Sequence, residues 1–254
     1  MLIAKIVKYV LWRPRYWFQF INLAFVKPIQ IRFKLHTYGM YNKLYYPAEI
    51  RNKCKSIKVE SYIKPPISWD FFNLQLVSQD TSKFMVNCAG VEVTIGQLPS
   101  LWRKSIDENI DPEVLQSSHR FHWLVERVSQ EINTDDIDSM FHIINSWIND
   151  FQYDRTGLAW QPYTVSERLC NWITFWQISG PQIHAQDISY KWLNSIQEHA
   201  IFLANTLEYP ASKIINNHIL NNARALYISG CFLDNKNITD LGRELFTRHL
   251  PDMV

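Results

Sequence analysis

Apolar residues recur at helical spacing from about residue 115 to the C-terminus, and this pattern restricts the fold more than any other feature. Thr134, followed by Asp135 and Asp136, has the chemistry of a helix start, with a capping hydroxyl and first-turn acids. The 254 residues include only 7 Gly, which argues against a loop-rich β architecture and against glycine-rich phosphate loops. The sequence therefore predicts a mainly α protein, with helices at residues 119–132, 134–148, 164–176, 187–203, 215–226 and 238–249.

Short polar turns join these expected helices, so consecutive helices should pack antiparallel. A run of such hairpins can curl into an (α/α) toroid with inner and outer rings. Two short alternating segments, 57–63 and 91–95, are the only strand-like signals, and they predict a small hairpin appendage. Residues 36–56 are polar and show no regular period. We therefore divide the chain into an N-terminal region, 1–100, and a helical domain, 101–254.

Charge is distributed unevenly along the chain. Residues 1–60 hold 12 Lys and Arg against 2 Asp and Glu, whereas the remainder holds 14 against 22. The basic, aromatic N-terminus can form an amphipathic helix suited to an anionic surface. Lipid headgroups, an acidic polysaccharide and the acidic remainder of the same chain all fit this pattern. No recognition motif for nucleic acid accompanies the basic residues.

Metal, disulfide and membrane-spanning features are not indicated. The four cysteines lie far apart without a CxxC pattern, and Cys170 and Cys231 fall in apolar helical patterns that predict core positions. We expect no cofactor and no metal site. No stretch is long and apolar enough to predict a transmembrane helix, and no secretory signal is visible at the N-terminus.

An unusual cluster of amides occupies residues 213–226. Asn217, Asn221 and Arg224 recur on one side of the expected helix, whereas Ile219 and Ala223 belong to its apolar face. Asparagine competes with the backbone for hydrogen bonds and is a poor helix former. A solvated face with an Asn cap is the structural explanation. A binding or catalytic site is the functional one, and the density of amides beside a histidine and an arginine favours it.

Three segments of the helical region resemble one enzyme family. Residues 118–124 (SHRFHWL) look like a helix start written LHYFDWL in that family. Residues 160–173 (WQPYTVSERLCNWI) are similar to its W-x-PY-x-x-S-x-R-x-x-NW-I pattern, and residues 217–226 (NHILNNARAL) to its NH-L-L-x-N-x-x-A-L pattern. The family is that of the heparinase II/III-like polysaccharide lyases, which includes heparin-sulfate lyases and oligo-alginate lyases. The resemblance covers about residues 100–252.

The resemblance implies an N-terminal (α/α) toroid and cleavage of uronate-containing acidic polysaccharides by β-elimination. In such chemistry the proton on C5 is abstracted and the 4-linked sugar leaves. A neutral donor on the substrate carboxylate stabilises the developing enolate. The resemblance implies catalytic roles for Asn217 and His218. It also implies substrate-binding roles for a wider set: Trp160, Tyr163, Arg168, Asn171, Trp172, Asn221 and Arg224.

Structural explanations exist for several of these residues. Trp172 at helical spacing fits a core, Arg168 can pair with Glu167 or a helix end, and Tyr163 can open a helix beside Pro162. The family's catalytic tyrosine would follow the segment that begins at Leu250, and neither it nor a β-sandwich has a counterpart in the sequence. The toroid is therefore expected to be incomplete, with an apolar edge that favours self-association.

Two alternatives to an active lyase remain. One is a non-catalytic saccharide-binding or assembly factor of a surface-polysaccharide pathway. The other is a peripheral membrane protein that binds through its basic N-terminus. The resemblance implies a periplasmic location, whereas the lack of a visible signal peptide favours the cytoplasm.

Overall fold

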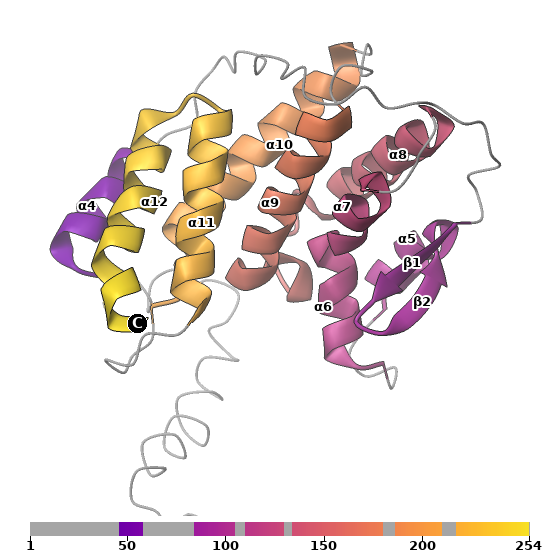
Figure 1. The fold of residues 1–254 in the computed structure, drawn as a ribbon, viewed down its shortest axis with the longest axis horizontal. Coiled ribbons are helices and arrows are strands. Elements are labelled where there is room, and N and C mark those ends of the chain that lie inside the picture. The colour runs from indigo at the N-terminus through magenta and orange to yellow at the C-terminus, as the bar shows by residue number, and fades with distance from the viewer. Residues whose placement is uncertain are drawn as a thin grey trace, which may run out of the picture.

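The computed structural model describes residues 46–57, 84–104, 110–129, 134–179, 186–209 and 217–253. This part of the chain is mainly helical, as predicted, with one two-stranded antiparallel sheet. The helices form an array from α4 (Ala48–Ser56) and α12 (Lys236–His249) at one end to α8 (Thr134–Phe151) and the sheet at the other (Figure 1). No described helix has the length and hydropathy needed to cross a bilayer. The expected helices of residues 1–35 and the alternating pattern at 58–63 lie outside the described residues.

Two helices at the centre of the array, α9 (Pro162–Ser179) and α11 (Asn217–Phe232), pack side by side. Their contacts advance in the same direction, because Tyr163 meets His218 and Glu167 meets Arg224. The two helices are therefore parallel. The intervening helix, α10 (Gln186–Asn205), packs against both. This order places the N-terminal halves of α9 and α11 next to each other.

The pair α11 and α12 packs antiparallel and at very close range. A Cβ on Gly230 would lie less than 3.0 Å from backbone atoms of Thr239, and one on Gly242 would lie equally close to the backbone of Tyr227. Both glycines are therefore needed for the close approach of the two helices. The short turn between them ends at Asn235, whose side chain accepts a hydrogen bond from the Ile238 amide and caps α12.

The sequence predicted one helix over residues 119–132, but the structure divides this region at Phe121. Helix α6 (Pro112–Arg120) ends and α7 (His122–Val128) begins there, because Phe121 adopts a left-handed backbone conformation with φ of 61°. The break leaves three carbonyls without helical hydrogen-bond partners, and side chains donate to them instead. Trp102 donates to Ser118 O, Arg168 to His119 O and Asn171 to Arg120 O. The Phe121 ring is fully buried, which holds the break in place.

The high tryptophan content is explained largely by the core. Six described tryptophans are buried: Trp102, Trp123, Trp147, Trp160, Trp172 and Trp192. Trp147 lies near the centre of their contacts and packs edge-to-face on Trp172 at a centroid distance of 5.5 Å. Aromatic burial supplies large apolar area per side chain. These rings therefore stabilise the contacts between helices.

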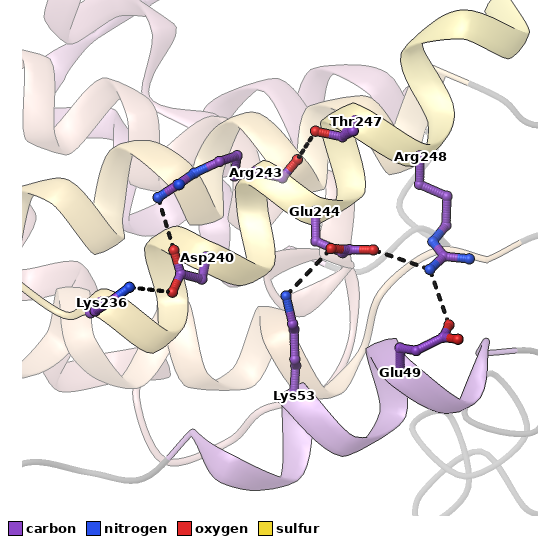
Figure 2. A network of polar contacts seen from close by, with 8 residues as sticks. All are labelled: Glu49, Lys53, Lys236, Asp240, Arg243, Glu244, Thr247 and Arg248. Carbon is purple, nitrogen blue, oxygen red and sulfur yellow. Dashed lines mark hydrogen bonds and ion pairs between the residues drawn. The ribbon is translucent and has the colours of Figure 1, made fainter.

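The first described helix, α4, was not expected from the polar pattern of residues 36–56. It packs on α12 and α10, with Ile50 and Cys54 buried and with the Tyr46 hydroxyl donating to Leu207 O. Ion pairs cross the outside of this contact, from Lys53 to Glu244 and from Arg248 to Glu49 (Figure 2). Exposed pairs contribute little to stability. The buried side chains therefore account for most of the contact.

The sheet and one helix start differ in detail from the prediction. The segment at 91–95 does form a strand, β2 (Val91–Thr94), but its partner is β1 (Met85–Cys88). Helix α9 begins at Pro162, two residues before the start expected at Thr164. Proline suits the first helical position because its missing N–H has no helical partner there.

The two cysteines that were expected in the core have different environments. Cys170 is buried, as predicted, but Cys231 is exposed, so that prediction was wrong. The four cysteines are free thiols in the structure. The continuous hydrophobic core includes residues from α4, from β1 and from the later helices.

Candidate functional site

A polar surface lies over the N-terminal halves of α9 and α11, and we call it the α9–α11 polar face. Its residues come from both helices and from the α6–α7 break. They are Arg120, His122, Tyr163, Glu167, Asn171, Asn217, His218, Asn221 and Arg224. On α9 the members recur every four residues, and on α11 Asn217, Asn221 and Arg224 recur in steps of four and three, with His218 next to Asn217. This spacing places each set on one side of its helix.

Glu167 is the central charged group of this face. Its Oε2 lies 2.9 Å from His122 Nε2, and its Oε1 accepts a 2.6 Å hydrogen bond from Arg224. The Glu167 side chain is only 11% exposed, whereas those of His122 and Arg224 are 48% and 45% exposed. Burial raises the pKa of Glu167, but the hydrogen bond from His122 and the charge of Arg224 outweigh it, so its pKa lies below the usual value. Glu167 is therefore an ionised, fixed carboxylate.

Tyr163 lies one helical turn before Glu167 and contacts both a guanidinium and an imidazole. The Arg120 guanidinium lies 5.0 Å from its ring centroid, and the His218 ring lies 4.8 Å away at a tilt. His218 Nδ1 is 3.3 Å from Glu208 Oε1. Burial raises the pKa of Glu208 against the opposing effect of His218. The Tyr163 ring thus has both a guanidinium and an imidazole as close neighbours.

The amides of the face differ in their surroundings. Asn217 is exposed at the start of α11, whereas Asn171 donates to Arg120 O at 2.8 Å and holds the α6–α7 break. The Asn221 side chain lowers the pKa of Glu167, although its buried Nδ2 is outside hydrogen-bond geometry with every described residue. Asn217 can therefore still donate to a ligand, whereas the buried Nδ2 of Asn221 is not accessible from the surface.

Beneath the face, Arg168 is fully buried in a cage of aromatic rings. Its guanidinium lies 3.9 Å from the Trp147 ring centroid and donates to the carbonyls of His119 and Ala159. Its Nη2 atom has no hydrogen-bond partner among the described residues. Burial lowers the pKa of Arg168. Carbonyl dipoles and ring faces, which attract cations, surround this charge.

Two buried histidines next to Arg168 are held in the neutral form. Trp147 Nε1 donates to His119 Nδ1 at 2.9 Å, and Arg168 Nε donates to His199 Nε2 at 3.1 Å. Each histidine must therefore keep one nitrogen unprotonated. Burial, assisted by the charge of Arg168, lowers the pKa of His119 to about 3 and that of His199 well below its usual value.

The structure divides the residues expected to bind substrate into two groups. Tyr163, Asn171, Asn221 and Arg224 lie on the polar face with the two expected catalytic residues, Asn217 and His218. By contrast, Trp160, Arg168 and Trp172 are buried beneath it, with 3%, 0% and 0% exposure. Their rings and guanidinium contact protein groups only, so the expected direct contacts with a sugar are replaced by core packing. His199 stacks on Trp160 at 4.5 Å, in the position where a sugar ring was expected.

Sequence reasoning missed two members of the face, Glu167 and His122. Glu167 was considered only as a partner of Arg168, and His122 was only part of a resembling segment. The four-residue spacing of Tyr163, Glu167 and Asn171 was the available signal. Glu208 had no local signal, because it meets His218 across residues that lie outside the described ranges.

Comparison of the chain with protein-family models, with curated proteins and with solved structures finds no match.

Proposed function

We propose that this chain is the helical, N-terminal part of a polysaccharide lyase that acts on uronate-containing acidic chains by β-elimination. The α9–α11 polar face is the proposed saccharide site. The observation that supports this most is the meeting of three sequence segments on one surface. His122 comes from the first, Tyr163 and Asn171 from the second, and Asn217 and Arg224 from the third.

In the proposed reaction the Asn217 amide binds the carboxylate of the uronate. Hydrogen bonding spreads the charge of the developing enolate, and a donor fixed in advance is most effective. His218 is placed beside it by the Tyr163 ring and by Glu208. Its imidazole can add a second donor or transfer a proton. The buried Asn221 amide lies beside Glu167 and helps to lower the pKa of that carboxyl group.

The arrangement of helices supports the toroid part of the proposal. Helices α9 and α11 are parallel neighbours. Helix α10 runs antiparallel to α9, because Arg168 meets His199 and Trp176 meets Trp192, and α12 runs antiparallel to α11. Two successive helical hairpins, α9–α10 and α11–α12, give this order. In an (α/α) toroid the first helix of each hairpin would form one ring and the second helix the other.

The experiment measures unsaturated uronate products by ultraviolet absorbance and saccharide binding by calorimetry on the full chain. Uronate polymers are the substrates. Loss of one preorganised donor lowers kcat by about 10²–10³, so Asn217→Ala and His218→Ala should each produce a loss of that order. The exposed residues Asn237 and His142 provide matched controls as alanine variants.

The possible outcomes separate the functions. Equal turnover by Asn217→Ala, His218→Ala and the controls would contradict the assigned roles. Binding without turnover, weakened by the two site variants alone, would support a saccharide-binding factor instead of a lyase. If the chain binds no uronate polymer, both the lyase function and the saccharide-binding function are excluded.

A further inference from the structure

We infer that His122 is the proton-transfer group of the α9–α11 polar face, positioned by Glu167 and Arg224; this inference rests on the proposed function. The hydrogen bond between His122 Nε2 and Glu167 Oε2 is the starting point. A carboxylate accepts but does not donate when ionised, so Nε2 must carry the proton. This tautomer leaves the lone pair on Nδ1, where no hydrogen bond from a described residue is present.

Glu167 has the features of an orienting carboxylate. It is largely buried, and Arg224 holds its other oxygen at 2.6 Å, so the carboxylate cannot rotate away from His122. A buried carboxylate also stabilises the imidazolium that forms when the histidine accepts a proton. Arg224 alone would neutralise Glu167, so the additional contact with a half-exposed imidazole is the feature to explain.

The backbone at Phe121 is an independent indication. A bulky residue with a left-handed backbone costs on the order of 1–3 kcal/mol, and the φ of Phe121 is 61°. The strained break places His122 at the first position of α7, facing Glu167. Arg168 and Asn171 support the break through the carbonyls of residues 119 and 120. Strain maintained by buried side chains is typical of functional sites.

The proposed step balances within the site and the substrate. His122 Nδ1 takes the proton from C5 of the uronate, and the C–H electron pair becomes the C4–C5 double bond. The C4–O bond breaks, and the leaving oxygen takes the proton back from the imidazolium. Asn217 stabilises the carboxylate during this step, and Glu167 stabilises the charged imidazole. The products are an unsaturated uronate and a free sugar hydroxyl.

Three measurements on the full chain test His122. The first is turnover of uronate polymers, the second is incorporation of deuterium at C5 in heavy water, and the third is rescue by added imidazole. We expect His122→Ala to lower the first two by about 10²–10⁴-fold, the usual contribution of a positioned acid or base. Added imidazole should restore part of the activity in this variant and have no effect on His142→Ala.

Rescue distinguishes chemistry from structure, because free imidazole does not repair a misfolded helix. Turnover of His122→Ala within about threefold of the wild type would overturn the inference and leave the proposed function intact. A loss that imidazole does not rescue, with unchanged circular dichroism, would also overturn it. Saccharide binding by the wild type without turnover or exchange would overturn both the proton-transfer role and the lyase reaction, and would leave a saccharide-binding factor. No saccharide binding would overturn both the inference and the proposed function.

Discussion

Acidification should destabilise this fold through two buried histidines. His119 and His199 each accept a hydrogen bond, from Trp147 and Arg168, so protonation would place two donors face to face. The pKa of His119 is lowered to about 3 and that of His199 also lies well below its usual value, mainly because both are buried. In the unfolded chain both should titrate near the usual value of about 6.5.

The sign and size follow from linkage. Between the unfolded and folded pKa values the unfolded state binds more protons, so the free energy of unfolding falls as the pH falls. Going from about pH 7 to about pH 5, each histidine should cost about 2 kcal/mol, and the two together about 4 kcal/mol. Glu208 opposes this trend, because burial raises its pKa and the folded state can take up its proton in the same range.

Urea unfolding followed by circular dichroism, at several pH values, measures this effect. Between about pH 7 and about pH 5, the free energy of unfolding of His199→Gln should fall by about 2 kcal/mol less than that of the wild type. This expectation does not depend on the stability of the variant at neutral pH. His142→Gln should keep the whole drop, because this side chain is exposed. A His199→Gln profile with the wild-type slope would refute the reasoning, since it would mean that His199 is protonated in the folded state.

Three further predictions concern helix packing, the buried arginine and backbone strain. Gly230→Ala or Gly242→Ala should lower the free energy of unfolding by more than about 2 kcal/mol, because a Cβ would meet backbone atoms of the opposite helix. Thermal unfolding measures this loss. Gly96→Ala serves as the control, because a Cβ there meets no atom within 4 Å. Arg168→Lys should cost about 2–3 kcal/mol in urea unfolding, because lysine cannot reproduce the fixed donors of the guanidinium to two carbonyls and a histidine; a loss below about 0.5 kcal/mol would contradict this. Ala89→Gly should stabilise by about 0.5–1 kcal/mol, because Ala89 has φ of 52°, and an unchanged or lower melting temperature would argue against strain in that turn.

The sequence predicted helix type and apolar faces well, because these depend on local periodicity. The helix start at Thr134 and the buried positions Ile219 and Ala223 are confirmed. The break at Phe121 was not predicted, because phenylalanine continues the apolar pattern. Side chains distant in the sequence, such as Arg168 and Asn171, cap the carbonyls there. Local pattern contains no information about such partners.

The candidate site was predicted only in part for the same reason. Surface members of α11 could be identified from their spacing, since polar residues alternated with a clear apolar face. The complete burial of Arg168 could not be predicted from the sequence, because arginine is almost never fully buried without a charged partner. Here ring faces and carbonyls replace the usual carboxylate. The burial of Trp172 followed the simple expectation that a tryptophan at helical spacing packs in a core.

The contact of α4 with α12 joins parts of the chain that are made at very different times. Glu49 and Arg248 are 199 residues apart, and Lys53 and Glu244 are 191 apart. At a synthesis rate of about 5–20 residues per second, α4 is complete roughly 10–40 s before its partner. During this interval Ile50 and Cys54 lack the surface that later covers them. Docking of α4 on α12 is therefore a late event of biogenesis, and the apolar residues of α4 are accessible to chaperones until α12 has been synthesised.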